Sequence, residues 1–165
     1  WTQWQTAIGT GAYLSTSRNG GTDAATAGAV YNFTVVNNDI IRNQWTNAIQ
    51  TWVCYAWHSV EGYSKMGSYT GTGLDVPVNL GFEPAFVMIK CVDNNGSSWF
   101  IVDNKRGAGA KGVAKFIEPN SSGAEFTNSV YGCVFNSSGF TIPGGTSVNL
   151  NQNGIEYIFM AFAAT

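Results

Sequence analysis

The chain has 165 residues, enough for one domain or two small ones with a sizeable hydrophobic core. Charged residues make up only 11% of the chain and the formal net charge is −2, which argues against the basic surface of a nucleic-acid-binding protein. No stretch has the pattern of a basic amphipathic helix, so the sequence gives no sign of membrane insertion or membrane-surface binding.

The sequence predicts an all-β chain, because apolar runs are separated by Gly, Asn and Ser while helical periodicity is nearly absent. Asp93-Asn94-Asn95-Gly96 predicts a hairpin turn, and residues 105–112 predict a loop. We expect strands over 1–8, 12–15, 30–36, 40–42, 51–57, 63–69, 85–92, 98–103, 116–117, 129–135, 140–142 and 157–164.

Two of these runs resemble each other. Residues 157–164 are apolar on both faces of the predicted strand, and so are residues 52–57. Aligning Tyr157 with Trp52 also aligns Ala161 with Ala56. The self-comparison predicts a degenerate tandem repeat, with an incomplete first unit at 1–59 and a complete second unit at 60–165. It further predicts that the chain is a C-terminal piece of a larger parent protein.

Several segments together resemble a known family. They are Val60–Gly73, Leu80–Lys90, Trp99 with Asp103 and Arg106, Asn136–Phe140, and Tyr157–Ala163. The family is a domain of unassigned function that recurs near the ends of tail-fibre and other virion proteins of marine tailed bacteriophages, including cyanophages. The resemblance covers 60–165 and, more weakly, 1–58.

The resemblance implies an antiparallel β-sandwich, jelly-roll-like, in a structural protein of the virion surface such as a tail fibre, knob or appendage. It implies assembly in the host cytoplasm, contact with other virion proteins, and adhesion to host-envelope polysaccharide. It supplies no catalytic, cofactor-binding or metal-binding residues.

The predicted strands also bear on assembly. A two-layer sandwich needs each sheet to be apolar on one face only, yet 85–92, 99–102 and 157–164 are apolar on both. We therefore expect the outer faces to be covered, either by the neighbouring repeat or by another copy of the chain. By analogy with phage fibres, the expected homo-oligomer is a trimer.

The three cysteines, Cys54, Cys91 and Cys133, are odd in number and form no C-x-x-C motif. They lie among apolar neighbours, so we predict buried free thiols.

No motif predicts an enzyme. His58 is the single histidine, which excludes a multi-His metal site, and a triad with Ser59 and Asp39 lacks a nucleophile elbow. The Asp93 turn lacks the downstream Glu of a calcium loop, and Gly71-Thr72-Gly73 lacks the helix of a phosphate-binding loop. We therefore predict no catalytic residue, no metal and no cofactor.

Candidate glycan contacts are side chains that combine an aromatic face with polar donors. Trp45, flanked by Arg42 and Asn43, is the first candidate, and its alternative is a side chain folded over the sandwich edge. Arg106 is the second, and its alternative is an ion pair with Asp103 that fixes the loop.

Three other functions stay open at this point. One is a capsid-decorating or filament-building protein with no receptor role, and another is a self-assembling extracellular adhesin of a bacterium. The third is a polysaccharide depolymerase, which needs two carboxylates across a cleft.

Overall fold

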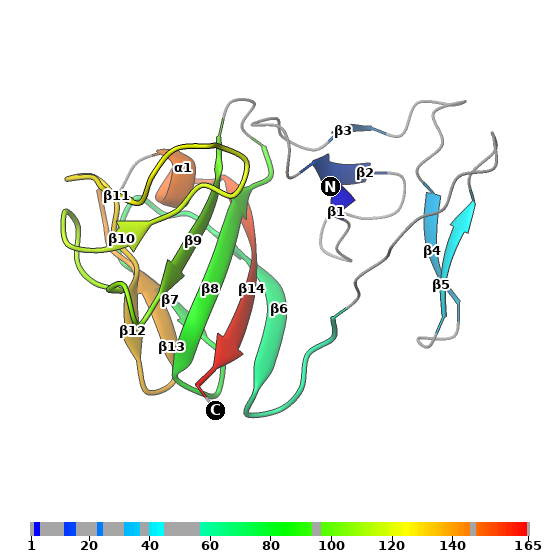
Figure 1. Cartoon of the computed structure of the whole chain (residues 1–165), viewed down its shortest axis with the longest axis horizontal. Coiled ribbons are helices and arrows are strands. Elements are labelled where there is room, and N and C mark those ends of the chain that lie inside the picture. Colours follow the sequence, from blue (N-terminus) through cyan, green and yellow to red (C-terminus); the bar gives the residue numbers. More distant parts are fainter. Residues whose placement is uncertain are drawn as a thin grey trace.

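In a computed structural model, the structure describes the strands at 2–3, 12–15, 23–24, 32–36 and 40–44 and the residues 57–93, 97–145 and 148–164 (Figure 1). The strands before residue 45 form two antiparallel groups, a three-stranded sheet ordered β1-β2-β3 and a hairpin of β4 and β5. Their bounds are β1 Thr2–Gln3, β2 Ala12–Ser15, β3 Asp23–Ala24, β4 Asn32–Val36 and β5 Ile40–Gln44. Residues 51–56 of the strand predicted over 51–57 lie outside the described residues, so the tandem repeat stays a prediction.

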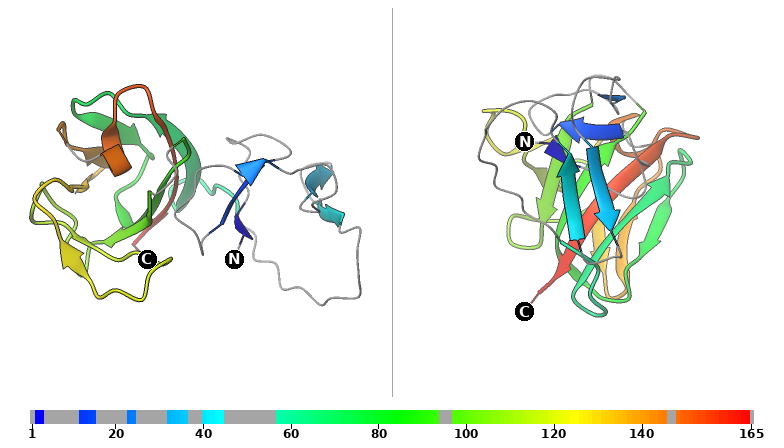
Figure 2. Two further views of the ribbon diagram at one scale, coloured as in Figure 1. Left: turned by 90° about the horizontal axis from the view of Figure 1, so that it is seen from above. Right: turned by 90° about the vertical axis from the view of Figure 1, so that its right-hand side faces the viewer.

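Residues 57–164 carry an antiparallel β-sandwich, as expected (Figure 2). One sheet is four-stranded with the order β6-β14-β8-β9, and the facing sheet is three-stranded with the order β12-β13-β7. The bounds are β6 Ser64–Thr70, β14 Glu156–Ala163, β8 Pro84–Cys91, β9 Trp99–Asp103, β12 Val134–Asn136, β13 Gly139–Ile142 and β7 Val76–Asn79.

The chain passes between the two sheets at the connections β6–β7, β7–β8, β9–β12 and β13–β14. A small two-stranded sheet of β10 (Lys115–Phe116) and β11 (Phe126–Thr127) lies within the β9–β12 connection. A one-turn helix, α1 (Val148–Asn151), precedes β14.

The structure corrects the predicted strand pattern in several places. The strand expected over 129–135 begins only at Val134, because the Tyr131 amide donates to the Asn128 carbonyl and closes a turn. The strands β3 and β11 are not among the predicted ones, and neither is β7. The strand β7 carries Pro77, which cannot donate a backbone hydrogen bond and which occurs mainly in edge strands.

The core lies between the two sheets. Alternate residues of β14, namely Tyr157, Phe159 and Ala161, are buried there. The Phe159 ring meets Phe140 of the opposite sheet edge-on, with centroids 5.5 Å apart. Tyr69 stacks on Tyr157 at 5.0 Å. Aromatic contacts of this kind add to the free energy gained by burying the rings.

The outer face of the four-stranded sheet is also apolar. Trp99, Val92 and Ile158 form a second buried cluster there. Lys90 is fully buried on this face, and its Nζ donates to the carbonyls of Cys91 and Ser97, each at 2.9 Å.

All three methionines of the chain lie in one row across this outer face. Met160 is opposite Met66 on one side and Met88 on the other, and all three are partly buried. The expectation that the strands are apolar on both faces is therefore confirmed, whereas the expected covering of the outer face stays a prediction.

Cys91 and Cys133 are buried free thiols, as predicted, and Cys54 lies outside the described residues. Burial raises the pKa of Cys133 well above its ordinary value, so this thiol stays protonated and unreactive at neutral pH.

Candidate functional site

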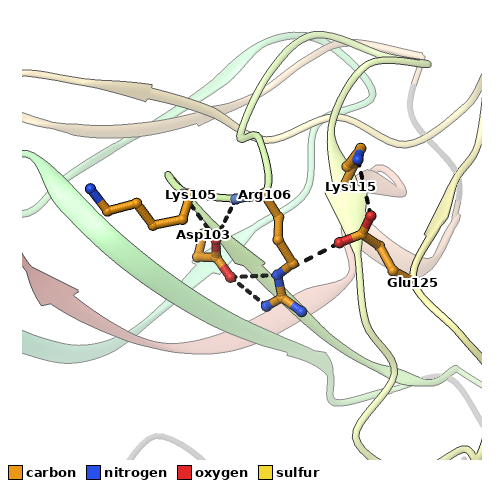
Figure 3. Close-up of polar contacts among 5 residues, drawn as sticks. All are labelled: Asp103, Lys105, Arg106, Lys115 and Glu125. Atoms are coloured by element: carbon orange, nitrogen blue, oxygen red, sulfur yellow. Dashed lines mark hydrogen bonds and ion pairs between the residues drawn. The ribbon is translucent and has the colours of Figure 1, made fainter.

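Arg106, a predicted glycan contact, lies in the turn after β9 and is held by carboxylates (Figure 3). Its Nε donates to Asp103 Oδ2 at 2.6 Å, and a second guanidinium nitrogen pairs with the same oxygen. Glu125 Oε2 lies 3.8 Å from Arg106 Nε, and Glu125 Oε1 lies 3.1 Å from Lys115 Nζ. The ion pair that was the alternative for Arg106 is therefore present.

Asp103 also closes the turn. Its Oδ1 accepts hydrogen bonds from the amides of Lys105 and Arg106, at 3.0 and 2.8 Å. Partial burial works to raise the pKa of Asp103, but the bonds from Arg106 and Lys105 outweigh it and hold the pKa below its ordinary value. The guanidinium is thus committed to fixing the loop.

The other predicted contacts cannot be assembled into one site. Arg42 and Asn43 belong to β5, where they pair with Thr34 and Phe33 of β4. Trp45 lies outside the described residues. The glycan-contact role of these three residues stays a prediction.

A different candidate is the hairpin that leads into β6. Val60 and Ser64 form a bridge in which each backbone amide donates to the other residue's carbonyl at 2.9 Å. The turn between them includes Gly62 at a φ of 73°, a conformation that glycine adopts without strain. Because its tip needs no side chain at Gly62, the hairpin can turn tightly and place its neighbours outward.

Two serine hydroxyls fix this hairpin. Ser64 Oγ donates to the His58 carbonyl at 3.0 Å and accepts from the Val60 amide at 3.1 Å. Ser59 Oγ accepts from the Met66 amide of β6 at 3.1 Å. Residues 57–60 are thereby bound along the first part of β6.

The hairpin and the turn after β7 line an open cavity of about 410 Å³. The hairpin contributes the polar residues Ser59, Glu61 and Lys65, and the turn after β7 contributes Leu80 and Gly81. Lys65 Nζ donates to the Asn79 carbonyl at 2.7 Å, which leaves two of its three N–H groups for a ligand. The cavity thus offers a carboxylate acceptor, ammonium donors and a hydroxyl within one depression.

An exposed aromatic ring lies beside these polar groups in the chain. Tyr63, between the lining residues Gly62 and Ser64, is 46% exposed. Its ring packs edge-on against Phe162 of β14 at 6.2 Å, and its carbonyl accepts from the Ala163 amide at 2.7 Å. Tyr63 is therefore an accessible ring held by the sandwich, and a rigid aromatic gives contact area at low entropic cost.

Within Val60–Gly73 the sequence predicts a strand over 63–69 and carries part of the family resemblance, but it did not predict this site. The signal that could have found it is an aromatic flanked by Glu-Gly and Ser-Lys, directly before a strand. What the sequence could not show was that the turn after β7 completes the cavity.

The described residues do not place Ser59 and His58 in a catalytic arrangement. His58 Nδ1 hydrogen-bonds the carbonyl of Ser59 at 3.0 Å, while the Ser59 hydroxyl is bound to the Met66 amide. The hydroxyl and the imidazole are thus each engaged with the backbone, and Asp39 lies outside the described residues.

Across the described part of the chain, no cluster of three or more His, Cys, Asp or Glu residues could hold a metal ion. Within the same residues, none of the helices has the length and apolar character needed to cross a membrane.

Comparisons with known proteins give a family without a function. No curated protein and no solved structure matches the chain. One family model, described as "Domain of unknown function (DUF7483)", matches residues 1–165. Since this match spans the whole sequence, the chain belongs to the DUF7483 family.

Proposed function

We propose that the chain is a structural and adhesive protein of a virion surface, part of a tail fibre, knob or similar appendage, and that its hairpin cavity binds a saccharide of the host envelope. The few charged residues and the extensive antiparallel pairing suit a rigid module that presents its loops. The viral assignment rests on the family resemblance of residues 60–165.

The observation that carries the adhesive part is the cavity that brings Glu61 and Lys65 together, in the same hairpin as the exposed ring of Tyr63. A sugar ring has an apolar face that can lie on an aromatic side chain and hydroxyls that both donate and accept hydrogen bonds. An exposed aromatic ring and a cavity with a carboxylate acceptor and ammonium donors, all in one hairpin, suit those two properties.

We propose binding without catalysis at this site. Hydrolysis of a glycosidic bond by the common mechanism uses a pair of carboxylates that flank the bond. Glu61 is the carboxylate among the cavity-lining residues, and no second one from the described residues joins it there.

Binding can be tested with the full chain and a panel of bacterial capsular and O-antigen polysaccharides, with titration calorimetry as the measurement. We expect Tyr63→Ala to weaken binding at least tenfold, which corresponds to about 1.4 kcal/mol. Leu74→Ala is the matched control, because Leu74 is 74% exposed and lies outside the hairpin that leads into β6. Equal binding by wild type and Tyr63→Ala would reject the ring as a sugar contact, and equal binding by Glu61→Gln would reject the cavity. Release of oligosaccharides would support the depolymerase alternative.

Location is tested separately. Gold-labelled antibody at a tail tip is the expected result. Label over the whole head or along filaments would instead favour the decorating or filament-building protein.

A further inference from the structure

The edges of the sandwich sheets differ in how their backbone groups are protected. At the β9 edge, Ile101 exchanges both backbone hydrogen bonds with Ile117, at 2.9 and 3.0 Å. The facing sheet has two edges, β7 and β12. The strand β7 carries Pro77, which removes a backbone donor from that edge. Next to β12, Gly109 and Cys133 exchange backbone hydrogen bonds at 2.9 Å in both directions.

The β6 edge is protected over its first part only. Val60 bonds to Ser64, and Ser59 bonds to Met66. The Gly71 amide donates to the Ile155 carbonyl, toward β14, and successive residues of an antiparallel strand direct their groups to opposite sides. The N–H and C=O of Ser68 and Thr70 therefore point away from β14.

Within the described part of the chain, these groups have no hydrogen-bond partner. No other described residue hydrogen-bonds to the backbone of Ser68 or Thr70 on that side, and both residues are exposed. Their side chains are small and uncharged. Tyr69 between them points into the core, where its hydroxyl donates to the Leu150 carbonyl at 2.8 Å. No proline, charge or bulky side chain protects this stretch, although such features usually block edge strands.

We infer that β6 pairs edge to edge with β6 of a second copy of this chain, about a twofold axis at Tyr69. In that register Ser68 lies opposite Thr70 of the other copy, and Thr70 lies opposite its Ser68. Each residue then donates and accepts one backbone hydrogen bond, so every open group of the stretch is satisfied.

A second copy fits this edge because the open stretch is complementary to itself, so one contact satisfies the open groups of both copies. The pairing also makes the two outer faces continuous, with the polar side chains of Ser68 and Thr70 at the seam and Met66 of each copy on the same face. The twofold pair differs from the trimer expected by analogy with phage fibres, and it does not depend on the proposed glycan binding.

The test measures the molar mass of the full chain by light scattering over a wide range of concentration. We expect a dimer at high concentration. Ser68→Pro removes an outward donor and leaves the β14 ladder intact, so it should halve the molar mass without unfolding the sandwich. Thr70→Lys should do the same if the proline variant fails to fold. Thr127→Lys on β11 is the matched control, because it adds the same charge at another exposed strand residue.

Hydrogen exchange gives a second readout that a structural role would not mimic. In the dimer, the amides of Ser68 and Thr70 should exchange slowly, and dilution should make them exchange quickly. A wild-type chain that is monomeric at every concentration would overturn the inference. So would a dimer or trimer in which these two amides exchange freely, or one that persists in the folded variants.

Discussion

Both faces of the four-stranded sheet carry large apolar side chains, but the two faces have different surroundings. On the inner face, Phe159 is 2% exposed and packs on Phe140 of the opposite sheet. On the outer face, the next residue, Met160, is only partly buried. Apolar composition alone therefore does not show which face of a strand packs in the core of the sandwich. The distinction comes from the facing sheet.

The outer face also carries charged side chains, among them Lys90 and Asp103. Lys90 donates hydrogen bonds to two backbone carbonyls, and Asp103 accepts one from Arg106 in the turn after β9. A buried ionic group of this kind costs free energy unless it is fully hydrogen-bonded. Below pH 10, the stability of the outer face should therefore depend on pH.

The largest expected effect is on the inner face. Phe159→Ala removes a buried ring and should lower the free energy of unfolding by about 3–5 kcal/mol. The matched outer variant is Met160→Ala, which should cost about 1 kcal/mol because its side chain is already partly exposed. Denaturant unfolding measures both. Equal losses would show that the two faces are equally important for folding.

The second prediction concerns Lys90. Burial lowers its pKa to about 8 from an ordinary value of 10.5. Between these two values the unfolded chain binds the proton more strongly, so the contribution of Lys90 to stability should rise with pH, by about 2 kcal/mol from pH 8 to pH 10.

The measurement is the difference in unfolding free energy between wild type and Lys90→Met. Burial also raises the pKa values of Cys133 and Tyr157, the latter to about 12, so these two groups should destabilise the folded chain in alkali. Because both proteins contain Cys133 and Tyr157, this effect cancels in the difference between wild type and variant. A difference that stays flat between pH 8 and pH 10 would show that Lys90 is not desolvated.

The smallest effect is expected at Asp103. Its folded pKa lies below the ordinary value, so its stabilising contribution is present above the unfolded pKa and is lost as the pH falls through the folded one. Asp103→Asn should cost about 1 kcal/mol at pH 7, since the pair is partly exposed, and nothing measurable in strong acid. Lys105→Gln is the control for lost charge, and a cost that persists unchanged in acid would assign the effect to packing.

The sequence predicts the long strands of the sandwich well, and its short elements poorly. β8 and β14 are long apolar runs with one charged residue each, Lys90 and Glu156, and a run that is apolar on both faces is typical of a central strand. By contrast, β7 has the sequence Val-Pro-Val-Asn, and it becomes a strand only because β13 pairs with it. This pairing brings together residues that are distant in the chain, and no local pattern encodes it.

The candidate sites follow the same division. The Asp103–Arg106 ion pair joins residues three apart and could be predicted from the sequence. The hairpin cavity could not, because it needs the turn at Leu80 and Gly81 next to residues 59–65. The sandwich fold brings Leu80 and Gly81 to the cavity, and the hairpin sequence alone does not encode that contact.

The position of β14 has a consequence for how the chain folds. It lies between β6 and β8, although both of those strands precede it by a long stretch of chain (Figure 1). During synthesis, the edges of β6 and β8 that pair with β14 stay unpaired until β14 has left the ribosome. Since non-local pairing closes long loops before it gains contacts, folding should be slow, and the waiting strands are then most prone to aggregate. Completion of the sheet is therefore the step at which a chaperone would act.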